Sequence, residues 1–509
     1  MAVRTQSADK INTLLQNLNN GSDLLTTLEG IKVVLQSTHP SELKELLKNV
    51  SFDPVFSCLN STNREELELS RDILGRLLEN IDVDVVLAQF HDELCMGLGH
   101  PQSDIRALCL KQIKRAAEEP SGLMTLLANP DLICLIISRV GDDSLAVAKV
   151  AIAVLQNVGS TANGQELLLA GQPLKDLQKT AEKSETIRYR VFEIVTSIAS
   201  SSPAGLEHVS SSSLLQALLE DLDTDDDLIQ LNAIEMLTNM ATSQHAMLFL
   251  DQRGVMGRLE NLLIGAQADP SQDFLIPSII KFFGSMAHFD PKAIIEKHGA
   301  FLQVTFDLLP SNDPSLVGIA VETIGFIGKS ADGKQTLNKQ GQRMIDAMKH
   351  IGRLLVQPPQ KTRVRALSAM QDLFTLQVEE QTDDILSTQE ECFTNLASKP
   401  WDLLLSLCKQ PFTEIRCNAL LILRALVNQP WAARCLRQEP GFLEYLLDRS
   451  TEPDKEGKEV KFEVVKALSE AVHTEEIFGR PALLRLKGYV REGPFFIQVQ
   501  SEVAMEGAS

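Results

Sequence analysis

The chain has 509 residues, of which 44% are hydrophobic and 23% charged, and this globular composition excludes an intrinsically disordered protein. Its formal net charge of −20 disfavours nucleic acid and anionic membranes as partners and suits a basic protein partner. Aromatic residues make up 5% of the chain, so the core must be aliphatic, which favours packed helices over a β-sandwich.

No targeting or membrane-spanning segment is predicted. The first ten residues, MAVRTQSADK, are polar, and the apolar run LICLII at 132–137 is far shorter than the ~20 residues of a membrane span. The eight cysteines form no C-x-x-C motif, and several fall in apolar helical stretches. We interpret them as reduced, mostly buried thiols of a cytoplasmic or nuclear protein.

Residues 1–62 are predicted to form an N-terminal helical cap. A repeat array is predicted over 63–491, with a degenerate first unit near Asn63, followed by a C-terminal tail at 492–509. Similar helical stretches recur in the array, each with a small or β-branched residue followed by apolar residues at helical spacing. Taking that residue as an anchor gives intervals of 42, 40, 42, 46, 41, 46, 53 and 45 residues. The anchors are Cys109, Ala151, Val191, Ala233, Ile279, Ala320, Ala366, Ala419 and Val464.

This period is typical of HEAT and armadillo arrays, which have two or three helices per repeat. The sequence therefore predicts an all-α fold, an armadillo/HEAT-type α-solenoid of about ten helical repeats. Such arrays present extended surfaces that hold other proteins. The interval of 53 residues contains VEEQTDDILSTQEE at 378–391, which predicts an acidic insertion in a loop, extending over about 378–399.

One group of potential metal ligands lies in FHDELCMGLGHP. His91 and Cys95 can share a helix face, with His100 nearby, but no fourth ligand is evident, and zinc sites in proteins need four well-placed donors. No H-E-x-x-H or G-x-S-x-G motif is present. No metal site, cofactor or catalytic residue is predicted, and the chain is not expected to be an enzyme.

The strongest electrostatic feature is EDLDTDDD at 220–227, with six carboxylates in eight residues. Part of this charge fits a helix end followed by a capped turn, and the rest suggests an acidic patch that meets basic side chains of a partner. An EF-hand is disfavoured because its glycine and terminal glutamate are missing. The candidate partner-binding residues are Glu220, Asp221, Asp223, Asp225, Asp226 and Asp227.

The segment GKSADGKQT has the G-x-x-x-x-G-K spacing of a P-loop, from Gly328 to Lys334. The hydroxyl that should follow the lysine is replaced by Gln335, and an apolar helical stretch precedes the segment in place of a strand. The same Gly-to-Gly spacing occurs at 159–164, so we predict a repeat turn between two helices. Gly171, Gly254 and Gly341 are predicted to mark the next stop in three such units.

The chain ends in GYVREGPFFIQVQSEVAMEGAS at 488–509. Its EGP followed by an aromatic pair, and its terminal EGA, resemble the tail of the 26S proteasome non-ATPase regulatory subunit 5 family, and the length and repeat content also fit. The resemblance implies a chaperone of proteasome base assembly. As such it binds the C-terminal domain of one AAA ATPase subunit and escorts an intermediate that also holds the neighbouring ATPase and a large non-ATPase subunit. It leaves before the mature particle forms, and it is a monomer before binding.

Three alternatives remain. A generic protein-binding scaffold for another complex is the main one. A nuclear-import type of armadillo receptor needs a ladder of W-x-x-x-N helices, but Trp401 is followed by Leu405 and Trp431 by Cys435 at that spacing. An ATP-dependent enzyme rests on Gly328–Lys334 alone.

Overall fold

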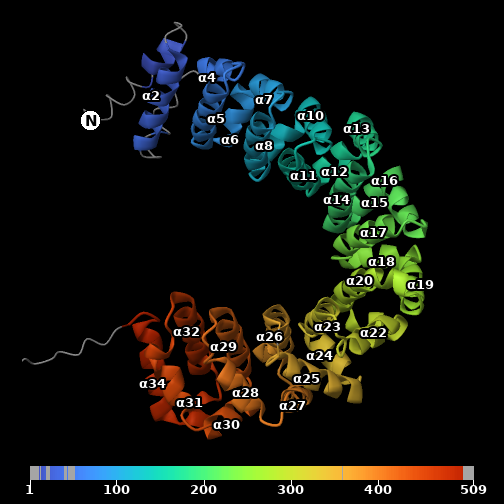
Figure 1. The fold of residues 1–509 in the computed structure, drawn as a ribbon, viewed down its shortest axis with the longest axis vertical. Helices are drawn as coiled ribbons and strands as arrows, with labels where there is room; N and C mark the ends of the chain where they lie inside the picture. Colours follow the sequence, from blue (N-terminus) through green and yellow to red (C-terminus); the bar gives the residue numbers. More distant parts are fainter. Residues whose placement is uncertain are drawn as a thin grey trace, which may run out of the picture. The chain divides into compact units, whose positions relative to one another are not determined.

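The computed structural model describes residues 11, 13–18, 23–38, 43, 52–357 and 359–496. Within these ranges every regular element is an α-helix or a short 3-10 helix, and successive helices stack on one another, which confirms the predicted all-α solenoid class (Figure 1). The chain divides into two compact units, Met1–Phe249 and Leu250–Ser509, each of which is described by itself. The number of repeats stays a prediction.

From α5 on, each long helix of unit 1 is followed by two shorter ones. Its elements are α2 (Leu24–Ser37), α4 (Asp53–Cys58), α5 (Arg64–Glu79), α6 (Val83–Gln89), α7 (His91–Leu98), α8 (Ser103–Ala117), α9 (Pro120–Leu127), α10 (Pro130–Val140), α11 (Leu145–Gly159), α12 (Ala162–Leu168), α13 (Gly171–Ala181), α14 (Glu185–Ser201), α15 (Pro203–Ser210), α16 (Ser213–Glu220), η1 (Asp221–Asp223), α17 (Asp227–Met240) and the start of α18 (Gln244–Gln252).

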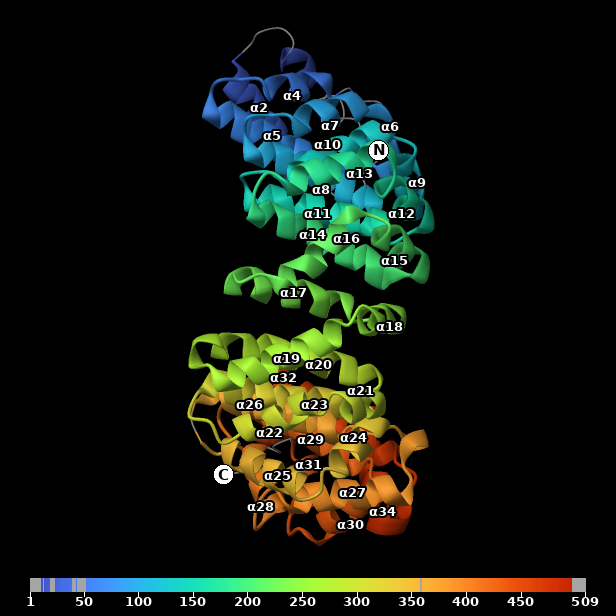
Figure 2. The ribbon, with the colours of Figure 1, turned by 90° about the vertical axis from the view of Figure 1, so that its right-hand side faces the viewer.

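The long helices of unit 1 stack one against the next. Helix α5 packs on α8, α8 on α11, α11 on α14 and α14 on α17, and Figure 2 shows α8, α11 and α14 one below another. The predicted anchors of these helices, Cys109, Ala151, Val191 and Ala233, are all at most 3% exposed. Small or branched side chains at these positions let neighbouring helices approach closely, as the sequence pattern predicts.

Unit 2 repeats the arrangement. Its elements are α19 (Val255–Ala268), η2 (Pro270–Leu275), α20 (Ile276–Phe289), α21 (Pro291–Lys297), α22 (Ala300–Leu308), α23 (Pro314–Ile327), α24 (Ala331–Asn338), α25 (Gln342–Leu354), α26 (Gln360–Phe374), η3 (Val378–Glu380), α27 (Asp383–Thr394), α28 (Pro400–Leu407), α29 (Thr413–Val427), α30 (Pro430–Gln438), α31 (Phe442–Leu447), η4 (Arg449–Thr451), α32 (Lys455–Glu470), α33 (Thr474–Phe478) and α34 (Arg480–Glu492).

In unit 2 the stacked helices are α20, α23, α26, α29 and α32, each packed on the next (Figure 1). Their anchors are completely buried: Ile279, Ala320, Ala366, Ala419 and Val464. Where α23 crosses α26, a Cβ atom added to Gly325 would lie 2.6 Å from the Cα atom of Ala369. The absence of a side chain at position 325 therefore permits this helix contact.

The glycines predicted to mark stops adopt the backbone conformation that such stops require. Gly171, Gly254 and Gly341 have φ angles of +57°, +70° and +58°, a region that side-chain-bearing residues rarely enter. Each lies at the start of the helix that follows it, α13, α19 or α25. The expected turn at the same place in three repeat units is confirmed.

The expectation of an acidic loop at 378–391 is wrong. After η3, residues Asp383–Thr394 form the helix α27, which packs on α24 and α25. Its buried residues Ile385, Gln389 and Phe393 follow one another at four-residue steps, which is a helical period. The aspartates in its first turn interact favourably with the positive end of the helix dipole. The charge run that suggested a loop therefore stabilises a helix.

The structure describes only part of the two ends of the chain. Of the predicted cap at 1–62, residues 1–10, 12, 19–22, 39–42 and 44–51 lie outside the described residues, and so do residues 497–509 of the predicted tail. In the described part of the chain, no single helix is long and apolar enough to cross a bilayer; α9 and α10 meet the criterion as a pair, bent by 95°.

Candidate functional site

The P-loop-like segment is a turn inside a repeat. Helix α23 enters it and α24 leaves it, and the Ser330 hydroxyl caps α24 by accepting a hydrogen bond from the Gly333 N–H at 3.0 Å. A Cβ atom at Gly333 would lie 1.8 Å from the Ile327 carbonyl oxygen, so this glycine allows α24 to pass against the end of α23. The prediction of a repeat turn is confirmed.

Lys334 is turned inward at this place. It is 3% exposed, and its ammonium donates to the carbonyl oxygens of Gly328, of Lys329 at 3.3 Å and of Asp372 in α26 at 3.2 Å. Burial lowers the pKa of Lys334 to about 8, partly offset by the charges of Glu380 and Asp372. The side chain thus satisfies carbonyls at two helix ends, as the termini of helices require.

The sister turn of unit 1 uses an amide for the same purpose. The Thr161 hydroxyl caps α12 by accepting a hydrogen bond from the Gly164 N–H at 3.3 Å. The side-chain amide of Gln165 donates to the Gly159 carbonyl at 3.0 Å and to the Ser201 hydroxyl at 3.0 Å. Gln165 follows its glycine as Lys334 follows Gly333. The lysine therefore has a structural counterpart in the sister turn, although not one of the same type.

The histidine and cysteine group stays without a fourth ligand. His91 and Cys95 lie on α7 with Nε2 and Sγ 3.7 Å apart, whereas His100 is held by the Leu59 carbonyl at 3.1 Å. No cluster of three or more His, Cys, Asp or Glu side chains suited to a metal ion occurs in the part of the chain that the structure describes. All eight cysteines are unpaired thiols, four of them buried and four half-buried.

The acidic segment at 220–227 has a divided role. Asp221 is 9% exposed; it accepts a hydrogen bond from the Tyr189 hydroxyl at 2.9 Å and pairs with Arg188 at 3.2 Å. Burial raises the pKa of Asp221, while these two partners lower it. Asp226 caps α17 by accepting from two backbone N–H groups. The sequence grouped all six carboxylates as partner-binding candidates, but these two have contacts within the chain.

The remaining carboxylates of the segment are more open to solvent. Glu220, Asp223 and Asp225 are exposed, and Asp227, in the first turn of α17, is half-buried. Glu220 also forms one wall of a groove of about 700 Å³ between α13, α14, α16 and α17. The acidic segment therefore reaches the edge of this groove through Glu220.

This acidic groove adds carboxylates that the sequence did not single out. Glu182 and Glu185 line it together with Glu220, against the single cation Arg188, while Phe192 and other apolar groups form its floor. The two additional glutamates come one repeat before the acidic segment, so aligning consecutive repeats would have found them. The arrangement can accept a basic side chain over an apolar base.

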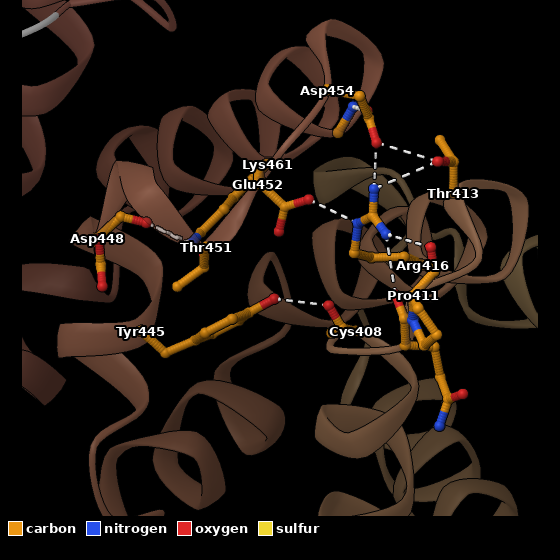
Figure 3. Close-up of polar contacts among 12 residues, drawn as sticks. Cys408, Pro411, Thr413, Arg416, Tyr445, Asp448, Thr451, Glu452, Asp454 and Lys461 are labelled. Atoms are coloured by element: carbon orange, nitrogen blue, oxygen red, sulfur yellow. Dashed lines mark hydrogen bonds and ion pairs between the residues drawn. The ribbon is translucent and has the colours of Figure 1, made fainter.

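The pairing of Arg188 with Asp221 belongs to a recurrent arrangement, clearest in unit 2. Arg416, in the first turn of α29, donates from Nε to Glu452 at 2.7 Å and pairs with Asp454, while its Nη1 reaches back to the Gln410 and Pro411 carbonyls (Figure 3). Arg416 and Glu452 are 3% and 2% exposed. These contacts link consecutive repeats.

Unit 1 contains the same clamp. Arg106 holds Asp142 through two hydrogen bonds of 2.7 Å and reaches back to the His100 and Pro101 carbonyls at 2.8 Å. Both clamps join an arginine to a carboxylate 36 residues later. Asp221 lies 33 residues after Arg188 and is buried in a related contact with Arg188 and Tyr189.

Beside the clamp of unit 2 lies a buried lysine. Lys461 is 1% exposed; it donates to the Asp448 carbonyl at 2.8 Å and to the Thr451 hydroxyl, and lies over the Tyr445 ring (Figure 3). Burial lowers the pKa of Lys461 to about 8. These contacts tie α31, η4 and α32 together.

Comparison with known proteins gives a family for nearly the whole chain. The family model described as "Proteasome non-ATPase 26S subunit" matches residues 7–509. The human 26S proteasome non-ATPase regulatory subunit 5 is 37% identical over 95% of this chain and 96% of its own length. The Bos taurus protein of that name is 37% identical over 97% and 98%, and the Drosophila melanogaster one 25% identical over 95% of each.

Among solved structures, an engineered protein aligns with 85% of this chain and all of its own, at a TM-score of 0.41 and 15% identity, which is too distant to add to the argument. The sequence relationship, in contrast, extends through both units and includes the described part of the predicted tail. The chain belongs to the family of the 26S proteasome non-ATPase regulatory subunit 5.

Proposed function

We propose that this protein is a chaperone for assembly of the base of the 26S proteasome regulatory particle. It binds the C-terminal domain of an AAA ATPase subunit and is released before the mature particle forms. The observation that carries the proposal is the 37% identity, over 95% of the chain, to proteins named as regulatory subunit 5 of that particle. We place this function in the cytoplasm and also in the nucleus.

The helical array suits a protein that binds and holds another protein. Its helices stack through nearest-neighbour contacts, which give an extended surface. A chaperone of this kind masks a surface of its client and yields it to a competitor, and neither step requires chemistry. The partners are the ATPase subunits of the base and a large non-ATPase base subunit.

The acidic groove of unit 1 is the proposed contact for the ATPase domain. Its three glutamates, Glu182, Glu185 and Glu220, face the solvent beside one arginine, so basic side chains of a partner are attracted. Exposed Asp223 and Asp225 extend the negative field beyond the groove. Desolvated charges in such a contact add specificity and raise the association rate more than they add affinity.

Affinity purification of the full chain from cell extract, followed by mass spectrometry, tests the function. Base ATPases and a large non-ATPase subunit should copurify, without core-particle subunits. Recovery of an unrelated complex, with no base subunits, would instead assign the protein to the class of general scaffolds and overturn the proposal.

A charge-reversed variant tests the contact. Glu182→Lys, Glu185→Lys and Glu220→Lys change the groove and leave the structural residues Asp221 and Asp226 in place. The matched control carries Glu166→Lys, Glu207→Lys and Glu296→Lys, three exposed glutamates outside the groove. The groove variant should lose tenfold or more in ATPase recovery while the control retains it. Equal recovery from both variants would mean that the ATPase binds elsewhere.

A further inference from the structure

Arg188 lies at a place in its repeat where other units carry a structural donor. In four stacked helices, the side chain three residues before the buried anchor donates to carbonyl oxygens of the segment just before that helix. These side chains are Arg106, Gln230, Arg363 and Arg416. Arg188 has the same place before the anchor Val191, but it has no such carbonyl partner in the part of the chain that the structure describes. Arg188 therefore does not hold the segment before its own helix.

Arg188 also lacks the carboxylate that the clamps provide. Both clamps pair their arginine with a carboxylate 36 residues later, whereas the residue 36 positions after Arg188 is Thr224. Arg188 contacts Asp221 instead, through Nη2 at 3.2 Å, and its Nε atom has no hydrogen-bond partner among the described residues. Arg106, in contrast, holds its carboxylate through two hydrogen bonds of 2.7 Å. The stack of repeats thus depends less on Arg188 than on the clamped arginines.

The guanidinium of Arg188 belongs to the lining of the acidic groove. Its Cζ atom lies 5.6 Å from the centre of the Tyr189 ring, and its side chain is 31% exposed. Burial and, to a smaller extent, the charges of Glu185 and Glu220 raise the pKa of Asp221, so these three carboxylates lie near one another. One guanidinium thus lies beside several carboxylates and an aromatic ring, which is the environment that the groove offers to a basic side chain of a partner.

We propose that Arg188 is an internal competitor of the partner for the acidic groove. A basic side chain of the partner displaces the guanidinium from Asp221, and Arg188 turns towards the solvent. Because Arg188 gives up a single ion pair and no contact to a loop, its displacement leaves the helix stack intact. The proposal rests on the contact of this groove with the ATPase domain, which is part of the proposed function.

The competition also sets the kind of partner segment that binds. The first cation of the segment only exchanges one ion pair for another, which adds little affinity. Any further cation pairs with the glutamates of the groove, Glu182, Glu185 and Glu220, which have no other cation than Arg188 in the groove lining. Segments that carry several basic side chains are therefore favoured over segments that carry one.

Fluorescence anisotropy of the full chain with a fluorescein-labelled peptide GRLARALRG measures the competition. Arg188→Gln removes the competing charge and keeps a polar side chain, so it should bind the peptide about fivefold or more tightly than the wild type. Arg188→Lys keeps the charge and should stay within about twofold of the wild type. The glutamate counterpart GELAEALEG is the control peptide and should bind neither protein at this groove.

Lys183→Gln is the matched control variant. It removes one positive charge from the segment before α14, but the Lys183 ammonium lies 3.2 Å from where a Cβ atom of Gly141 would be, and Lys183 does not line the groove. Its affinity for the peptide should stay within about twofold of the wild type. An equal gain in Lys183→Gln and Arg188→Gln would show a general effect of net charge, and an unchanged or lower affinity of Arg188→Gln would show that Arg188 does not compete. Either result overturns the proposal.

Thermal unfolding tests whether Arg188 is free of the stack. Arg188→Gln should unfold within a few degrees of the wild type, whereas Arg106→Gln, in the clamp of unit 1, should unfold at a clearly lower temperature because it leaves the buried carboxylate of Asp142 unpaired. Loss of the folded state in Arg188→Gln would show that Arg188 is a clamp residue, which also refutes the competition.

The competition and the base-assembly function fail in different assays. If base ATPases copurify with the wild type and Arg188→Gln binds the peptide no better, the function stands and the competition is refuted. If no base subunit copurifies and Arg188→Gln binds the peptide more tightly, the function fails and the competition stands. If neither the wild type nor Arg188→Gln binds the peptide at up to about 1 mM, the groove does not accept basic segments and the competition is refuted.

Discussion

The buried lysine at the P-loop-like turn predicts a pH dependence of stability that a surface lysine could not cause. The change is Lys334→Gln, which installs the amide found at the sister position Gln165. Lys334 has a pKa lowered from 10.5 to about 8 by burial. Between these values the unfolded chain binds a proton that the folded chain lacks, so stability rises as the pH increases from 8 towards 10.5.

The size of the effect follows from the shift. A pKa change of one unit corresponds to about 1.36 kcal/mol, so the whole window gives about 3 kcal/mol. Between pH 7 and pH 9.5, about 2 kcal/mol of this should appear in the wild type and be absent from Lys334→Gln. Lys461 has a similar shift, but it is present in both proteins and its effect cancels in the difference.

Urea unfolding followed by tryptophan fluorescence measures this difference. Both tryptophans, Trp401 and Trp431, lie in unit 2 with Lys334, so the signal reports the correct unit. Lys334→Met serves as a second variant: it should lose the same pH dependence and also be about 1–3 kcal/mol less stable than Lys334→Gln, because carbonyls at two helix ends lose their donor. If wild type and Lys334→Gln differ by a constant amount from pH 7 to 9.5, Lys334 is not a buried ammonium and the reasoning fails.

Three further predictions concern the backbone and the repeat interfaces. Gly254→Ala should cost about 1 kcal/mol through its φ of +70° alone, since no atom lies within 4 Å of the new Cβ, whereas Gly257→Ala inside α19 should be neutral or slightly stabilising; urea titration of both variants tests this contrast. Gly325→Ala should cost about 1–3 kcal/mol in the same assay, because its Cβ would lie 2.6 Å from the Cα atom of Ala369. Asp221→Asn should weaken its contacts with the arginine and tyrosine of α14 and cost about 1–2 kcal/mol, seen as faster amide exchange in α14 and α17; unchanged exchange would contradict the clamp.

The stacked helices could be predicted because their signal is local and periodic. Ala151 and Ala320 mark buried helix crossings, because a small residue followed by apolar residues at helical spacing gives a helix one apolar face that a neighbouring helix must cover. The turn at Gly328 could be predicted for a similar reason, because its sister at Gly159 repeats the spacing within the same chain. Repetition supplies a comparison that a single non-repetitive domain lacks.

The candidate site was predicted less well, because its properties depend on side chains from different repeats. Nothing local to Asp221 shows that Tyr189 and Arg188, 32 and 33 residues earlier, would bury it. Glu182 and Glu185 were missed for the same reason, since the groove brings them beside Glu220 through the stacking of repeats. Helix α27 was missed because the charge run was weighted above the four-residue spacing of its buried residues.

The clamps show how one acidic segment can serve both stability and recognition. A carboxylate that is buried against an arginine of the preceding repeat, such as Asp142 or Glu452, cannot be removed without leaving a buried charge unpaired, which is costly. Exposed carboxylates such as Glu220 and Asp225 can be replaced without this cost, because water screens their charge in the absence of a partner. Reversing the exposed charges should therefore alter binding and leave the fold intact, whereas replacing the clamped carboxylate should weaken the stack on which the groove is built. The surface can thus be adapted to a partner independently of the repeats that position it.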